Sequence, residues 1–241
     1  MLKRYRIPLI ALLLLLIVVP AAAAERVDDV PPVLEFDAVR FETADLINGE
    51  LFIVGKGEAT SPERQHFVLK TIPFGDEPQE TLEVVLYDGV TYVRENNDAQ
   101  WYIEEDLGDV TSLFHDSGYA VSKIGSTTIA GVATDQYQVW VPGEEDIDHI
   151  ALDFWIGQQQ AYLYQDQISI HGNDPDLGEL RLETVTRYFD FDSANIFVGP
   201  PANAKVRDSG ASFFGDSKLL GRASKILALP AVRDAALARV R

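Results

Sequence analysis

Alternation of apolar and polar side chains is the feature that most constrains this fold. It recurs along most of the chain from Gly49 to Asp192, in short segments separated by residues that favour turns. Side chains on a β-strand point to the two faces in turn, so this period of two predicts strands arranged as an antiparallel meander. The predicted strands are Leu51–Ala59, His66–Ile72, Thr81–Tyr87, Val90–Arg94, Trp101–Glu104, Ala133–Val141, His149–Ile156, Ala161–Ile170 and Glu179–Phe191.

Helix is scarce in this sequence. Only two segments, Ala38–Asn48 and Leu107–Ser117, are candidate helices. Asp109 supports the second, because an Asp side chain at the start of a helix can accept a hydrogen bond from the first turn. The chain is therefore predicted to be mainly β.

Several predicted strands are apolar on both faces. All four residues of Leu51–Val54 are apolar, and only Glu83 interrupts Leu82–Tyr87. A strand with one face in water would be polar on that face, so either a second layer covers the sheet or the sheet curls and keeps its inner face dry. With few helices available, we expect a single curved antiparallel sheet with an apolar concavity, and a filled β-sandwich core remains the alternative.

The first 24 residues are typical of a secretory signal. Positive charges up to Arg6 precede the apolar run Pro8–Val19 and the small residues Ala21–Ala24. Cleavage after Ala24 would leave Glu25 as the first residue of an extracytoplasmic protein that is periplasmic, envelope-bound or secreted. An uncleaved membrane anchor is the alternative.

The sequence has no cysteine. This excludes a lipidated cysteine after the signal, and it also excludes disulfides and thiolate chemistry, so the core alone must hold the fold. The 217 residues that follow the signal suffice for one domain. We place this domain at 25–204 and a tail at 205–241.

Charge is distributed unevenly along the chain. The formal net charge is −18, to which the signal contributes +3 and Lys205–Arg241 contributes +5, so residues 25–204 carry −26. A body of this charge repels nucleic acid, which we exclude as a partner. In the tail, Leu219, Ile226 and Leu229 share one helical face and basic residues share another. This pattern predicts contact with a membrane surface or a protein partner, and a tail that is disordered or docked on its own acidic body is the alternative.

No motif indicates an enzyme, a cofactor or a metal. The sequence lacks a GxSxG elbow and an SxxK motif, and its four histidines lack the paired spacing of metal ligands. A loose calcium site at Asp174, Asp176 and Glu179 remains open as an alternative, although the spacing departs from that of a calcium loop. We therefore predict no catalytic residue, no cofactor and no metal.

Five segments resemble parts of the bacterial outer-membrane lipoprotein carrier-like superfamily. They are Asp88–Arg94 with Trp101-Tyr102, Ile129–Val141, Leu152–Gly157, Ala161–Ile170 and Asn195–Ala204. This superfamily includes LolA, LolB and the mycobacterial LppX/LprG-type envelope lipoproteins, and the resemblance covers roughly Leu34–Ala204. The chain departs from the mycobacterial branch in lacking the lipidated cysteine.

The resemblance implies a half-open β-barrel, a single curved antiparallel sheet with one or two helices in its mouth. It also implies that a lipid or another long apolar ligand binds in the cavity and is carried between membranes; an envelope sensor with the same fold and no ligand is the alternative. Combined with the apolar strand faces, it predicts a ligand-binding lining. The predicted lining residues are Phe52, Val54, Leu82, Val84, Tyr92, Phe154, Ile156, Tyr162, Tyr164 and Ile168.

Overall fold

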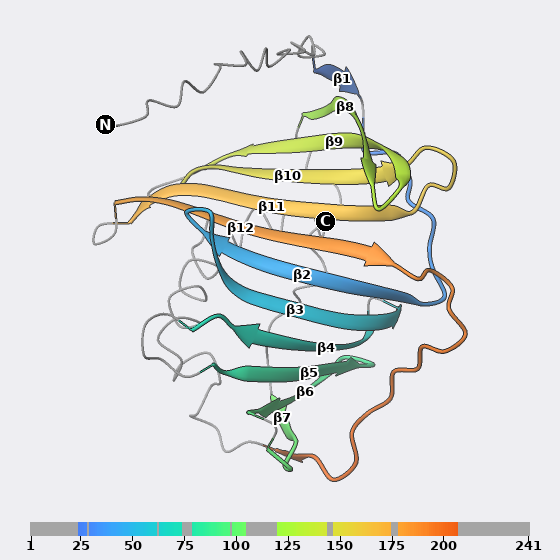
Figure 1. The fold of residues 1–241 in the computed structure, drawn as a ribbon, viewed down its shortest axis with the longest axis vertical. Coiled ribbons are helices and arrows are strands. Elements are labelled where there is room, and N and C mark those ends of the chain that lie inside the picture. Colours follow the sequence, from blue (N-terminus) through green and yellow to red (C-terminus); the bar gives the residue numbers. More distant parts are fainter. Residues whose placement is uncertain are drawn as a thin grey trace, which may run out of the picture.

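The computed structural model of the chain describes residues 24–206, apart from 28, 62, 74–78, 97, 105–119, 144–146 and 175–177. In this part, thirteen strands form one sheet in the order β1-β8-β9-β10-β11-β12-β2-β3-β4-β5-β6-β7-β13 (Figure 1). The strands are β1 (Glu25–Val27), β2 (Val39–Ile47), β3 (Glu50–Ser61), β4 (Arg64–Thr71), β5 (Thr81–Tyr87), β6 (Val90–Glu95), β7 (Tyr102–Glu104), β8 (Val121–Ile129), β9 (Val132–Pro142), β10 (Ile147–Gly157), β11 (Leu163–Asp174), β12 (Gly178–Phe189) and β13 (Lys205–Val206).

The predicted single curved antiparallel sheet is confirmed. Every neighbouring pair is antiparallel except β13 with β7. The sheet is open, because its order ends at β1 on one side and at β13 on the other (Figure 1). All predicted strands are present, and the structure adds β2, β8 and the short edge strands β1 and β13.

The predicted helix at Ala38–Asn48 is wrong, because this segment forms β2. β2 pairs with β12 on one side and with β3 on the other, so neighbouring strands satisfy its backbone groups. Its buried residues Val39 and Phe41 are two apart, as in a strand. Leu107–Ser117 lies wholly in the gap 105–119 and is outside the described residues; none of the described residues forms a helix.

Two meanders make up the sheet. β2 to β7 form an N-terminal half, β8 to β12 form a C-terminal half, and the β12–β2 pairing joins them. In this joint, residues from Leu182 opposite Ile47 to Phe189 opposite Arg40 are in register. The pleat is therefore continuous across both halves, and each face of the sheet continues from one half into the other.

The two faces differ in character. We call the face that carries Phe154 the apolar face and the face that carries Asp153 the polar face. Phe154 lies opposite Tyr137 of β9 and Asp166 of β11, whereas Asp153 lies opposite Gln138 and Gln167. Phe154 and Ile156 therefore lie on one face, and Asp153 and Trp155 lie on the other.

Three groups of buried side chains lie on the apolar face. The C-terminal cluster comprises Val121, Tyr137, Val139, Val141, Ile147, Ile150, Leu152, Phe154, Ile156 and Ile170. The N-terminal cluster comprises Ile53, Leu82, Val84 and Val93, and a rim cluster comprises Val39, Phe41 and Ala59, with Phe36, Phe67, Tyr188 and Phe191 against it. With no disulfide in the chain, these clusters supply the main burial of apolar surface in the described residues.

Two glycines of β3 leave room for side chains of the neighbouring strands to pack against its backbone. A Cβ atom on Gly57 would lie 2.5 Å from Phe41 Cζ and 2.6 Å from Phe67 Cβ, and one on Gly55 would lie 2.6 Å from Leu69 Cδ2. The aromatic packing of the rim cluster therefore requires the absence of a side chain at Gly57.

We predict that Gly57→Ala destabilises the protein by about 1–3 kcal/mol, the usual cost of inserting a methyl group into a packed site. The matched control is Gly125→Ala in β8, where an added Cβ would meet no atom within 4 Å. Its free energy of unfolding should stay within about 0.5 kcal/mol of wild type. Urea unfolding monitored by tryptophan fluorescence would measure both, and equal stability of the two variants would contradict the prediction.

Candidate functional site

The apolar face is the candidate binding surface. It belongs to a single sheet, and the described residues supply neither a helix nor a second sheet that packs on it. A sheet face in permanent contact with water would be polar, yet this face carries the three apolar clusters. Its chemistry suits an apolar ligand.

Seven of the predicted lining residues lie on this face. Phe154 and Ile156 belong to the C-terminal cluster, Ile168 packs against it, and Tyr164 contacts Phe191 of the rim cluster edge-on. In the N-terminal half, Leu82 and Val84 belong to the N-terminal cluster and Phe52 packs against it. The structure brings these seven side chains to one face.

Val54 and Tyr92 lie on the polar face instead. Val54 is opposite Ala44 and Lys70, and Tyr92 is opposite Val85. The alternation predicted Phe52 and Val54 on the same face, but a bulge opposite Asp45 and Leu46 shifts the register of β3. A bulge adds one residue to a strand, so Phe52 turns to the side of Ile53.

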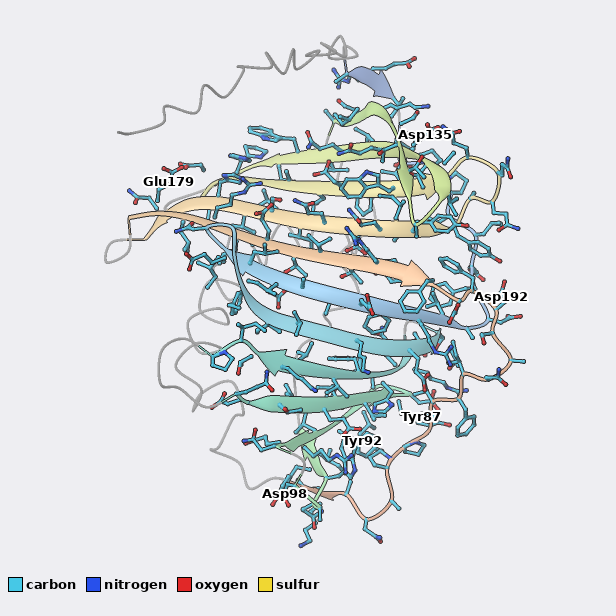
Figure 2. All side chains as sticks on the ribbon, in the orientation of Figure 1. Tyr87, Tyr92, Asp98, Asp135, Glu179 and Asp192 are labelled. Atoms are coloured by element: carbon cyan, nitrogen blue, oxygen red, sulfur yellow. The ribbon has the colours of Figure 1, made fainter. Side chains whose placement is uncertain are left out.

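Tyr162 lies beside the β10–β11 hairpin and has a structural partner. Its hydroxyl donates a hydrogen bond to Asp192 Oδ2 at 2.5 Å, and its ring stacks on Phe191 with the centroids 4.4 Å apart. Asp192 also accepts a hydrogen bond from the backbone N–H of Asp37. Tyr162 therefore ties the hairpin to the segment after β12, at the end of the strands where Figure 2 labels Asp192.

A polar stripe divides the apolar face where the two halves meet. It consists of Thr43 and Asp45 on β2, Thr184 and Thr186 on β12, and Asp166 on β11. The register places Thr186 opposite both Asp166 and Thr43, and Thr184 opposite Asp45. This central polar stripe lies between the C-terminal and N-terminal clusters, because β12 and β2 lie between β11 and β3.

Asp166 is the most strongly perturbed acid of the stripe. It is buried, and its Oδ2 accepts a hydrogen bond from the Tyr188 hydroxyl at 2.6 Å. Burial raises the pKa of Asp166 to about 6, although hydrogen bonds from Tyr188 and Thr186 oppose the rise. Burial likewise raises the pKa of Asp45, against a hydrogen bond from Thr184.

Sequence reasoning missed both acids. Asp166 is in phase with Tyr164 and Ile168, so the alternation already placed an acid on the apolar side of that strand. Asp45 was hidden because its segment was assigned to a helix. An acid at an apolar position of a strand is the signal that could have found Asp166.

Basic residues are concentrated on the polar face. Those that the register places there are Arg26, Arg40, Lys56, Arg64, Lys70, Arg94, Arg181 and Arg187. Among the described residues, the apolar face has only Lys123 on β8 and Lys205 on β13, at or next to the edges of the sheet. Lys123 Nζ donates to Asp135 Oδ2 at 2.7 Å, so its charge is already paired.

Asp135 lies at the same end of the strands as Asp192 (Figure 2). Burial would raise its pKa, but donors from Lys123, Ser126 and Gln158 outweigh this effect and hold the pKa of the carboxyl below its usual value. A stably ionised and fully bonded carboxylate of this kind fixes the ends of β8 and β9.

The histidines of the described strands contact other side chains. His66 bonds Glu83, which also accepts a hydrogen bond from Arg94. His149 stacks on His171 with the ring centroids 4.3 Å apart. Within the described residues no group of three or more histidines and acids could hold a metal ion. The alternative calcium site includes Asp176, which lies outside that part, and so remains untested.

No helix in the described part of the chain combines the length and apolarity needed to span a membrane. The predicted signal at 1–24 lies outside the described residues except for Ala24, as does the tail beyond Val206.

Comparison with known proteins gives distant structural likenesses only. No family model and no curated protein matches the sequence. Among solved structures, LprF from Mycobacterium bovis is similar with a TM-score of 0.38 and 11% identity, over 69% of this chain and 90% of that one. A LolA superfamily protein from Nitrosomonas europaea has a TM-score of 0.28 and 12% identity, over 68% and 90%.

A DUF1329 family protein from Desulfovibrio piger is similar with a TM-score of 0.23 and 9% identity, over 76% of this chain and 89% of that one. At these scores the likenesses carry neither the fold nor a function, and the fold described here rests on the strand pairing.

We predict that Asp166→Asn changes how stability depends on pH. The folded protein binds the Asp166 proton more tightly than the unfolded chain does, so this carboxyl stabilises the fold at low pH and loses that contribution as pH rises from about 4 through about 6. The rise from 3.8 to about 6 corresponds to about 3 kcal/mol.

Asparagine can still accept the Tyr188 hydrogen bond but does not ionise. The stability of Asp166→Asn relative to wild type should therefore increase by up to about 3 kcal/mol between pH 4 and pH 7. Urea unfolding at pH 4, 5, 6 and 7 would measure the difference, with exposed Asp98→Asn as the control. A difference that does not vary with pH would refute the prediction.

Proposed function

We propose that this is an exported cell-envelope protein that binds a lipid or another long apolar ligand against its apolar face and carries it between membranes. The observation that supports this is the apolar face itself, which continues across both halves of an open sheet. Each buried CH₂ group contributes about 0.8 kcal/mol, so a chain of about fourteen carbons would gain about 10 kcal/mol before ordering costs. Binding of this strength allows reversible carriage.

Export is supported by where the sheet begins. The predicted first residue after signal cleavage, Glu25, is also the first residue of β1. The whole described sheet would therefore remain in the mature protein, in the periplasm, in the envelope or outside the cell. No reaction is proposed, because the sequence carries none of the motifs of nucleophilic catalysis.

Ligand binding is tested by matched substitutions on the two faces. Ile168→Asp puts a charge on the apolar face, whereas Val185→Asp makes the same kind of change on the polar face, opposite Ala44 and Gln167. Both residues are β-branched and half-buried. We predict that Ile168→Asp weakens binding of the neutral fluorophore N-phenyl-1-naphthylamine at least tenfold and that Val185→Asp leaves binding within about twofold, because only the first places a charge against the ligand.

The same protein, purified without detergent, should carry lipid that native mass spectrometry and solvent extraction detect. Circular dichroism would confirm that both variants fold. A wild-type protein that is empty and binds no fluorophore would contradict lipid binding and favour an envelope sensor.

We also propose that the basic tail brings the acidic body to a membrane. Lys205 and Val206 pair with β7, so the deletion that tests this role begins at residue 207. Residues 207–241 carry +4. Each Lys or Arg near an anionic surface contributes about 1 kcal/mol of attraction, which salt screens over about 8 Å at physiological ionic strength.

We predict that deleting 207–241 leaves the sheet folded and lowers affinity for anionic vesicles in a flotation assay, and that added salt removes the difference between the two proteins. Neutral vesicles are the control. Equal flotation with and without the tail would contradict a membrane role and indicate that the tail is a linker or a protein-docking segment.

A further inference from the structure

The apolar face is interrupted by acceptors of hydrogen bonds and not by cations. Its central polar stripe contains two carboxyl groups, on Asp45 and Asp166, and three threonine hydroxyls. The only cations of the described residues on this face are Lys123, which is paired with Asp135, and Lys205 on the edge strand β13.

We propose that the apolar face selects amphiphiles whose polar group is cationic or neutral, that Asp45 and Asp166 receive this group, and that apolar arms extend from it over the clusters on either side. This inference rests on the proposed function, because it names the class of ligand that the face would take. It predicts that the face discriminates against amphiphiles with an anionic polar group.

Discrimination against anions follows from the charges on the face. An anionic group at the stripe would lie beside a carboxylate at neutral pH, either Asp166 on β11 or Asp45 on β2, and near no unpaired cation among the described residues. Asp166 is buried, so little water would separate it from a group placed against it and its repulsion would be weakly screened, whereas water screens the partly exposed Asp45 more. A cationic or hydroxyl-bearing group would instead donate hydrogen bonds to the same oxygens.

The carboxylates have capacity for a ligand. Asp166 accepts hydrogen bonds from Tyr188 and Thr186, and Asp45 accepts one from Thr184. An ionised carboxylate offers about four lone-pair positions on its two oxygens, so each group can accept at least one further donor.

A ligand with two apolar arms fits the position of the stripe. The C-terminal cluster lies on β8 to β11, and the N-terminal cluster lies on β3 to β6. The stripe occupies β11, β12 and β2 between them, with neighbouring strands about 4.8 Å apart. A polar group at the stripe therefore has apolar surface on both sides within reach of ordinary acyl chains.

Other titratable groups on the same face do not neutralise the acids. Tyr188 bonds Asp166, and Tyr164 and Tyr137 lie on β11 and β9. Lys123 is opposite Tyr137 and paired with Asp135. Glu95, opposite Leu82, and Asp135, opposite Ile156, are further carboxyls of this face but lie outside the stripe, so at the stripe acidification should act on selectivity mainly through Asp45 and Asp166.

The test compares three ligands with the same fourteen-carbon chain. They are tetradecyltrimethylammonium, which is always cationic, monotetradecanoylglycerol, which is neutral, and tetradecyl sulfate, which is always anionic. Each displaces N-phenyl-1-naphthylamine from the full-length protein at pH 7.5, below its critical micelle concentration, with circular dichroism recorded to confirm folding. We expect the sulfate to bind at least tenfold more weakly than the other two.

The double variant Asp45→Asn/Asp166→Asn should reduce this gap to less than threefold, because asparagine keeps the shape and removes the charge. Each single variant should also reduce the difference in affinity between the sulfate and the other two ligands, so the test remains valid if the double variant does not fold. Asp153→Asn is the matched control, since Asp153 lies on the polar face next to Phe154 in sequence and bonds Gln136 and Gln138. Its selectivity should equal that of wild type.

Equal displacement by the three ligands in wild type would overturn the inference while leaving lipid binding intact. An unchanged gap in the asparagine variants would also overturn it, because some other group would then exclude the anion. A wild-type protein that binds no fluorophore at all would overturn the proposed function and the inference together.

Discussion

Most of this structure depends on the pairing of β12 with β2. The paired residues are far apart in the chain, as where Thr186 lies opposite Thr43, so forming the pair closes a long loop at an entropic cost that only extensive contact can offset. Without it, the described strands would be two separate meanders, each with a further open edge. With it, the pleat is continuous and the apolar faces of the two halves become one surface. The central polar stripe lies on and beside this joint, so the group proposed to select the ligand is a product of the same pairing.

Contacts at one end of the joint hold it closed. Asp190 pairs with Arg40 at 2.9 Å, and Asp192 accepts hydrogen bonds from the Tyr162 hydroxyl and the backbone of Asp37. Both acids have positive φ values, 53° and 57°, which bend the chain sharply after β12. Tyr162, which the sequence placed in the ligand lining, is a member of this group of contacts. Its hydrogen bond to an ionised partner accounts for its position without a ligand.

The sequence predicted the strands better than it predicted the faces. Alternation in Ala161–Ile170 placed Tyr164 and Ile168 correctly, because regular pairing preserves a period of two. The bulge in β3 was not visible in the sequence, so Phe52 and Val54 were assigned to one face although the structure separates them. The segment of β2 was predicted to be a helix, and it forms a strand because it pairs with distant β12 and with β3. Which of these side chains contact a ligand remains a prediction, since that depends on the ligand and not on the register.

The distribution of charge links solubility to the proposed selectivity. On the polar face Arg94 pairs with Glu83 and Arg181 with Glu183, while Arg64 pairs with Asp88 at a hairpin turn. An exposed pair such as Arg64–Asp88 contributes about 0–1 kcal/mol, so the stability of that pair alone does not explain why its cation lies on the polar face. Because the cations lie on the polar face, the acids of the central polar stripe have few cations on their own face. The stripe lies between the C-terminal and N-terminal clusters. The net negative charge of residues 25–204 favours solubility and repels anionic lipid surfaces. Under the proposed selectivity, the central polar stripe accepts an amphiphile whose polar group supplies a positive charge or hydrogen-bond donors.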